Sequence, residues 1–195
     1  MFKGLETAPA RLKRIKIERY TNLAQGLHWV TALLMFAVIV IAWVMVSMAK
    51  DNPYRDMMFT SHKSVGVTIL ALTVLRLIWR AGHRAPALPA NVAPWEAGLA
   101  KVSHWLLYAV LVIMPVSGYV LTATSTYPLS FFGLFDLPHL PTNKALSHAA
   151  AEVHEVTQWA VYGLIALHIF ATLWHTIAYR DGTLERMLPE QTNAE

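Results

Sequence analysis

Six of the nine histidines in this sequence lie in or at the ends of long apolar stretches. They are His28, His62, His104, His154, His168 and His175. Ionisable side chains are costly inside a bilayer, so each of these positions indicates a functional site. A neutral imidazole is an axial ligand of haem iron, and two imidazoles from facing helices hold one b-type haem inside a bundle. Haem binding is therefore the chemistry that these residues favour.

The spacing of the histidines predicts ligands at two depths. His154 and His168 are 14 residues apart, which corresponds to ~21 Å along a helix and nearly the same helical face. His62 begins one apolar stretch on the side of the membrane where His154 begins another, so these two are expected to hold one haem. His28 begins the first stretch on the opposite side. Its partner is either His168 or His175, which share a face, and depth alone does not choose between them.

The composition limits the chemistry further. The chain has no cysteine, which excludes disulfides, thiolate metal ligands and the covalent attachment of a c-type haem. The net charge of +4 and the pI near 9.4 raise the alternative of a nucleic-acid-binding protein, but no basic stripe is interleaved with exposed aromatic residues. We therefore expect a non-covalently bound haem and no nucleic-acid partner.

The elements that must position these histidines are membrane-spanning helices. Of the 195 residues, 55% are hydrophobic and only 14% are charged, which is outside the usual balance of a soluble domain. A spanning helix needs about 20 apolar residues. Four stretches are long enough, at residues 27–48, 62–79, 102–122 and 154–178. The predicted fold class is all-α, a four-helix transmembrane bundle over residues 27–178, with a basic tail at 1–26 and a second tail at 179–195.

The distribution of lysine and arginine predicts the orientation of the bundle. Of the 16 cationic residues, twelve lie on the side of the two termini. The other four are Lys50, Arg55, Lys63 and Lys144. By the positive-inside rule, both termini are cytoplasmic. The first apolar stretch exceeds the ~7–15 residues of a signal-peptide core, so it is expected to remain attached. In the tail before it, Leu12, Ile15 and Ile17 alternate with cations, which is typical of an interfacial or frayed helix.

Several short motifs, taken together, resemble those of bacterial cytochrome b561, the family that includes superoxide oxidase. They are Gln25-Gly-Leu-His28-Trp29, His62-x-x-x-Gly66, Arg76-Leu-x-x-Arg80, His104-x-x-x-Tyr108, the three histidines His154, His168 and His175, and Leu184-Glu-Arg-Met-Leu-Pro189. The resemblance covers residues 19 to 189. It implies two haem b groups in a protein of the bacterial inner membrane.

The resemblance also assigns the ligands. It implies that the inner haem is bound by His28 and His168 and the outer haem by His62 and His154, so these four residues are the expected metal ligands. His175 is then available for another role. For His175 and His104 we expect contact with a quinone or with a haem propionate.

One arginine and three glycines lie near the expected ligands. Arg76 is 14 residues beyond His62, on the same face and near the depth of the inner haem. Pairing with a propionate and an arginine that simply reaches the cytoplasmic interface are equally consistent with that position. Gly26, Gly66 and Gly163 would let a flat macrocycle approach the backbone, or would serve ordinary close packing of helices.

The outer connection, residues 123–152, carries two ambiguous features. Its apolar segment 131–135 is expected to lie in the headgroup region, with a lid over the outer haem as the alternative. The cations Lys50, Arg55 and Lys63 gather at the outer mouth. They would steer an anion such as superoxide, or they belong to a solvated loop in which Asp51 and Asp56 offset their charge. In the third stretch, Pro115 followed by Gly118 predicts a kink or local break.

Three functions compete on these observations. The first is an enzyme that oxidises superoxide at the outer face and reduces ubiquinone in the membrane. The second is an electron-relay subunit that links a partner dehydrogenase or a periplasmic redox protein to the quinone pool. The third, a transporter without haem, would not need opposed histidines at two depths. The expected partners are the lipid bilayer, a quinone, and superoxide or a redox protein.

Overall fold

The computed structural model describes residues 17–88 and 92–190. Its long helices are α1 (Asn22–Ser47), α2 (Arg55–Gly82), α3 (Pro94–Ala123) and α4 (Lys144–Trp174). Each is long and apolar enough to cross a membrane, which confirms the predicted all-α transmembrane bundle. Residues 1–16, with Leu12 and Ile15 of the expected interfacial helix, lie outside the described residues, as do residues 191–195 of the second tail.

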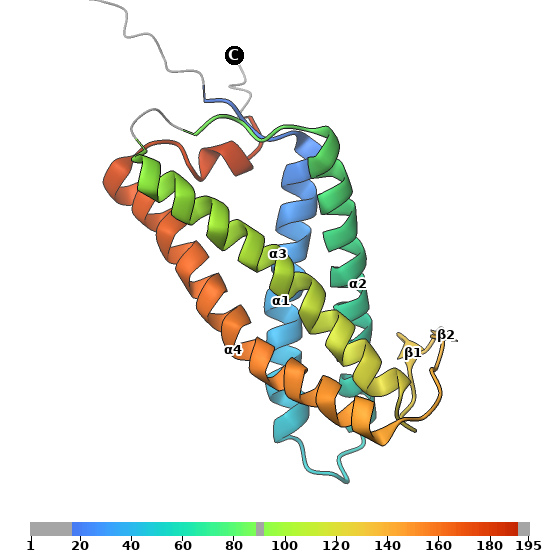
Figure 1. Ribbon diagram of the computed structural model, residues 1–195. Coiled ribbons are helices and arrows are strands. Elements are labelled where there is room, and N and C mark those ends of the chain that lie inside the picture. Colours follow the sequence, from blue (N-terminus) through green and yellow to red (C-terminus); the bar gives the residue numbers. More distant parts are fainter. Residues whose placement is uncertain (1–16, 89–91, 191–195) are drawn as a thin grey trace, which may run out of the picture.

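Shorter elements complete the two ends of the bundle. α4 continues directly into a π-helical turn, η1 (His175–Tyr179), and a short 3-10 helix, η2 (Glu185–Met187), follows. The connection between α3 and α4 contains two antiparallel strands, β1 (Ser130–Phe131) and β2 (Phe135–Asp136). We call the end with η1, η2 and the α2–α3 connection the terminus end, and the opposite end the hairpin end (Figure 1).

The helices begin before the apolar stretches that predicted them. α4 begins at Lys144, where the Asn143 side chain caps the first turn, so the prediction that His154 begins this helix is wrong. α2 begins at Arg55, which places His62 about two turns inside it. The physical reason is that helical hydrogen bonds continue through polar residues at the interface, whereas the apolar stretch marks only the hydrocarbon layer.

The four helices are arranged as a chain of neighbours (Figure 1). α1 packs along α2, α2 along α3, and α3 most extensively along α4. α1, α2 and α4 are described over their full lengths, and neither α1 nor α2 packs closely against α4. Side chains of α4 must therefore cross a wider separation to meet those of α1 or α2.

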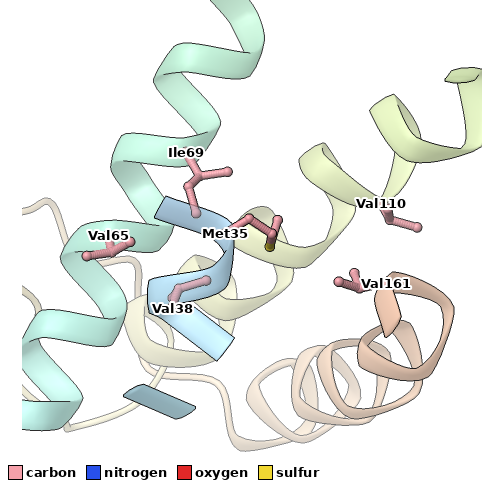
Figure 2. Packing of buried hydrophobic residues seen from close by; sticks show 6 residues of the cluster. All are labelled: Met35, Val38, Val65, Ile69, Val110 and Val161. Atoms are coloured by element: carbon pink, nitrogen blue, oxygen red, sulfur yellow. The ribbon is translucent and has the colours of Figure 1, made fainter. Parts of the chain in front are cut away.

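The buried core lies in the middle of the bundle and draws on all four helices. Figure 2 shows its members, which are Met35, Val38, Val65, Ile69, Val110 and Val161. Along α4, Val161 of this layer lies between His154 and His168. Many large apolar side chains point outward, Leu33 and Trp159 being 70% and 71% exposed, as expected where lipid rather than water surrounds the helices. α3 continues as a helix through Pro115 and Gly118, so these residues do not end it, although Pro115 has no N–H to donate within the helix.

A segment at the terminus end, residues 181–189, ties the two ends of the chain together, and we call it the strap. The Arg19 guanidinium donates to the carbonyls of residues 185, 188 and 189 at 2.7–2.9 Å. The Trp29 indole N–H donates to the Met187 carbonyl at 2.7 Å. The buried guanidinium of Arg186 donates at 2.7 Å to the carbonyls of Pro86 and Ala87 in the α2–α3 connection. Backbone carbonyls thus hold three separate segments together.

We predict that Arg186→Met destabilises the terminus end, because a buried cation that donates two hydrogen bonds is replaced by an apolar side chain. The expected loss is about 2 kcal/mol in the free energy of unfolding. It should appear as a lower melting temperature of the detergent-solubilised protein. The control is Lys101→Met, which removes an exposed cation from the same end. Equal melting temperatures for the two variants would contradict the role given to Arg186.

Candidate functional site

The hairpin end brings together His62 of α2 and His154 of α4. Their ring centroids are 6.2 Å apart and their planes are inclined at 76°. These two helices do not pack closely on each other, so the imidazoles face one another across the separation between them. The structure therefore places these two predicted site residues as an opposed pair.

α3 fixes the orientation of the His154 ring. Nδ1 of His154 lies 2.9 Å from the Met114 carbonyl oxygen and 3.2 Å from Oγ of Ser117. A carbonyl can only accept, so Nδ1 carries the proton and Nε2 remains available for a metal ion, the arrangement typical of a metal-binding imidazole. A Cβ added at Gly118 would lie 3.0 Å from Cε1 of His154. Gly118 therefore leaves the space that this ring occupies.

The terminus end brings three histidines together around α4. The centroid of the His168 ring is 6.2 Å from that of His28 on α1 and 5.7 Å from that of His104 on α3. Nδ1 of His104 donates to the Ala100 carbonyl at 2.6 Å. α3 packs closely along α4, whereas α1 does not. The backbone of α4 is therefore farther from α1, which carries His28, than from α3, which carries His104.

Two arginines and a tyrosine border this histidine cluster. Nη2 of Arg76 lies 3.2 Å from Nδ1 of His28. The guanidinium groups of Arg76 and Arg80 lie over the Tyr108 ring, at 5.5 and 5.8 Å from its centroid. Both arginines also line a cavity together with Arg84. Among the described residues, the cavity lining carries three guanidinium groups and no carboxylate, so it suits an anionic group such as a propionate.

The contact between Arg76 and His28 has a chemical consequence. A guanidinium only donates hydrogen bonds, so Nδ1 of His28 accepts in this arrangement and its proton is on Nε2. An imidazole that binds a metal ion through Nε2 carries its proton on Nδ1 instead. Metal binding by His28 through Nε2 therefore releases Arg76 for another acceptor.

The spacing of the imidazoles fits haem iron. Two imidazoles that bind one metal ion from opposite sides, each with a bond of about 2 Å, have ring centroids roughly 6 Å apart. His62 with His154 and His28 with His168 both have this separation, 6.2 Å. In the described part of the chain, Nδ1 of His62 is also buried without a hydrogen-bond partner. The residues present therefore fit b-type haem at both ends.

The glycines near these pairs lie beside open space. A Cβ added at Gly26, Gly66 or Gly163 would meet no atom within 4 Å. Tight packing of helices at these positions, one of the two interpretations of the sequence, would have produced short contacts. The open space favours the other interpretation, in which a flat group approaches the backbone.

His175 lies apart from the histidine cluster, in the π-helical turn η1. Its Nδ1 is 2.6 Å from Oδ2 of Asp181, a residue of the strap. Oδ1 of Asp181 accepts hydrogen bonds from the backbone N–H and the hydroxyl of Thr183, at 3.0 and 2.6 Å. Burial acts to raise the pKa of Asp181, but the hydrogen bonds from Thr183 and His175 outweigh it and hold that pKa below its usual value. The Asp181 carboxyl group is therefore ionised at neutral pH.

The sequence that carries these histidines matches a known protein family over most of its length. The family model described as prokaryotic cytochrome b561 matches residues 19–190. The chain belongs to the prokaryotic cytochrome b561 family. Membership makes it a multi-pass bacterial membrane protein that contains haem b and transfers electrons, as the sequence motifs indicated.

Three curated relatives cover nearly the whole chain. Cytochrome b561 homolog 2 of Escherichia coli (strain K12) is 28% identical over 90% of this chain and 94% of its own length. "Probable superoxide oxidase CybB" of Yersinia pestis is 29% identical over 89% of this chain and 98% of its own length. Cytochrome b561 homolog 1 of Escherichia coli (strain K12) is 28% identical over 90% of this chain and 99% of its own length.

The hairpin of this cytochrome b561 packs beside α2 and away from the histidine pair. The backbone N–H of Phe132 donates to Oγ of Ser64 at 2.7 Å, and the Lys63 ammonium donates to the Pro128 carbonyl. Ser64 is two residues from His62, which is about 200° around the helix. The hairpin therefore covers the opposite side of α2. This placement favours the expectation of a peripheral, membrane-facing segment over that of a lid.

The cations at the hairpin end are engaged in local contacts. Lys63 is bound to the hairpin carbonyl, and the Arg55 guanidinium lies 4.7 Å from the centroid of the Phe59 ring. The third, Lys50, is exposed. These contacts favour a structural role for two of the three cations over the steering of an anion.

Sequence reasoning missed the residues that orient the histidines. Met114 and Ser117 set the His154 ring, and Asp181 binds His175. Every residue has a backbone carbonyl, so a sequence does not indicate which of them accepts a hydrogen bond from a histidine. Asp181 followed by Gly182 and Thr183 is a turn signal, but nothing in it points back to His175.

We predict that Gly118→Ala lowers the haem content of the purified protein. The added methyl group would lie 3.0 Å from the His154 ring and push it away from the Met114 carbonyl, which holds its Nδ1. The haem absorbance per polypeptide measures the effect. Gly98→Ala is the control, because it makes the same substitution in the same helix where a Cβ meets no atom within 4 Å. Full haem content in Gly118→Ala would show that His154 does not need this space.

Proposed function

We propose that this cytochrome b561 holds two b haems and passes electrons from superoxide to ubiquinone. One haem is bound by His62 and His154 at the hairpin end, and the other by His28 and His168 at the terminus end. The observation that supports this most strongly is that each pair has the 6.2 Å centroid separation expected of two ligands to one iron. Each haem, when bound, supplies a carrier for one electron at a time.

The protein's own residues hold the ligands and exclude water. The Met114 carbonyl keeps Nε2 of His154 unprotonated and available. The layer formed by Val65, Ile69 and Val161 separates the two ends with apolar atoms. His154 and His168 lie ~21 Å apart along α4, so the pairs divide the ~30 Å hydrocarbon layer between them.

The arginine cavity supports the terminus-end site as the place of the haem propionates. Arg76 is the proposed partner of one propionate, since iron binding by His28 releases its guanidinium. Arg80 and Arg84 add positive charge to the same cavity. His104, whose ring is 5.7 Å from that of His168, is the proposed second contact, to a propionate or to the quinone.

The orientation follows from the charges. With twelve of 16 cationic residues on the side of the termini, the terminus end is the proposed cytoplasmic end in the bacterial inner membrane. Superoxide then reaches the hairpin end, and ubiquinone is reduced toward the cytoplasm. The support for superoxide as donor is the similarity to the Yersinia pestis protein named probable superoxide oxidase. The overall reaction is two superoxide anions, one ubiquinone and two protons giving two molecules of oxygen and one ubiquinol.

Rapid mixing with superoxide tests this function. The oxidised protein is mixed with superoxide in a stopped-flow spectrometer, with and without a soluble ubiquinone. The proposal predicts that superoxide reduces the haems and that quinone then reoxidises them. Haems that superoxide does not reduce, but that quinone reoxidises after prior reduction with dithionite, would support the electron-relay subunit in place of the enzyme.

The ligand pairs are tested by separate substitutions at the two ends. His154→Ala is expected to remove the hairpin-end haem and keep the other, so that haem per polypeptide falls by half. His148→Ala is the control, because His148 is on the same helix with its side chain 79% exposed. The pairing predicts that His62→Ala gives the same spectrum as His154→Ala. Two haems in either variant would contradict the pairing.

A further inference from the structure

The contact between His175 and the strap indicates a role for His175, which belongs to neither of the proposed ligand pairs. We propose that Asp181 is a positioning residue that holds His175 ready to donate a proton to ubiquinone at the terminus end. This inference rests on the proposed function, because it assumes that quinone is reduced at this end. It adds the source of the proton.

The geometry fixes which ring nitrogen of His175 is available. Nδ1 lies 2.6 Å from Oδ2 of Asp181, and the side chain of Asp181 is only 1% exposed. An ionised carboxylate accepts only, so Nδ1 carries a proton and Nε2 is left to exchange protons with a ligand. Nε2 makes no hydrogen bond to any residue that the structure describes.

The local backbone is shaped to make this contact. α4 widens into the π-helical turn η1 at His175, and single π-helical turns are frequent at functional sites. The chain then reverses through Arg180 and Gly182, whose φ angles are 51° and 78°. A non-glycine residue in the left-handed region persists where surrounding contacts hold it there. This reversal of the chain brings the Asp181 carboxylate to Nδ1 of His175.

Two further contacts hold the turn in place. The Tyr179 hydroxyl donates to Oε1 of Glu96 at 3.0 Å, and Oε2 of Glu96 accepts from the Ala93 N–H at 3.0 Å. These bonds attach η1 to the start of α3. The two hydrogen bonds from Thr183 immobilise the other oxygen of Asp181. The carboxylate is thus held from both sides.

The position of His175 suits delivery of a proton from the cytoplasm. His175 is two turns beyond His168 on the same face, ~10.5 Å along the axis, so a ligand between them can contact His175 and lie close to the terminus-end site. The His175 side chain is 20% exposed, which gives it access to the proposed cytoplasmic solvent. The Asp181 side chain, by contrast, is only 1% exposed.

The proposed step is a proton transfer from His175 to a quinone oxygen. Quinone oxygens accept hydrogen bonds only, so they need a donor. As ubiquinone receives an electron, the N–H bond at Nε2 of the doubly protonated His175 breaks, and that proton bonds to a quinone oxygen. His175 is left neutral, with Nδ1–H still donating to Asp181, and takes a new proton from cytoplasmic water. Two such cycles supply the two protons of ubiquinol, and the two electrons come from two superoxide anions.

Asp181→Asn tests this inference in the full-length, haem-loaded protein. An amide can donate to Nδ1 and so places the ring proton on Nε2, from which the ring cannot release it without becoming an imidazolate. We expect kcat for decylubiquinone reduction to fall at least tenfold with KM changed less than about twofold. Haem content and haem reduction by superoxide without quinone should match the wild type. The control is Glu190→Gln, which removes an exposed carboxylate just beyond the strap.

A double-substitution cycle separates positioning from a structural role. If Asp181 acts through His175, Asp181→Asn has no further effect in a His175→Gln background. Asp181→Glu, which keeps the carboxylate, should recover part of the rate. A rate loss that persists undiminished in the His175→Gln background would overturn the inference.

The outcomes also separate this inference from the proposed function. If the wild-type protein does not pass electrons to decylubiquinone, the proposed function fails. If the wild type does so and Asp181→Asn keeps its kcat, only the inference about Asp181 fails. NMR of ¹⁵N-histidine-labelled protein gives a readout without turnover, since Asp181→Asn should move the His175 proton from Nδ1 to Nε2. Unchanged His175 resonances would also overturn the inference.

Discussion

The opposition of imidazoles across helices that do not pack together is the constraint on which the rest of this structure depends. α4 carries one histidine toward each end, and each meets an imidazole at 6.2 Å from α2 or α1. Direct packing would bring those helix backbones closer and would remove the space between the rings. α3 makes the wider separation possible, because it packs along both α2 and α4 and joins the two sides.

The polar contacts around the histidines follow from that constraint. An imidazole ring that extends between two separated helices must be held in its orientation. α3 does this for His154, because the Met114 carbonyl accepts a hydrogen bond from the ring and Gly118 leaves space for it. At the other end, the Arg76 guanidinium donates to Nδ1 of His28 as long as His28 binds no metal ion through Nε2. Inside a bilayer, unpaired polar groups are costly, so these bonds stabilise the fold as well as the ring orientation.

The fold and the two depths of the histidines could be predicted from the sequence because a bilayer leaves few choices, whereas the choice of His168 over His175 as partner of His28 came from the family resemblance. A helix must be about 20 apolar residues long to span it, and an imidazole within such a stretch requires a reason. The separation of His154 and His168 by 14 residues therefore indicated two depths before any coordinates were known. The helix starts were predicted less well, since the interfacial turns at Lys144 and Arg55 are helical without being apolar.

The sequence could not predict which side chains from separate elements are in contact. His104 and His28 lie at similar distances from His168, and only the packing of α3 along α4 separates their roles. Asp181 reaches His175 because of a π-helical turn and a left-handed residue, neither of which has a reliable sequence signature. The first of these facts arises from helix packing, and the second from backbone geometry at the end of α4.

Quantitation of haem in the purified wild-type protein tests the central claim most directly. The pyridine haemochrome assay, combined with amino-acid analysis, gives the number of b haems per polypeptide. Two opposed imidazole pairs predict a ratio of two. A ratio that saturates at one, or a protein that binds none, would contradict the account.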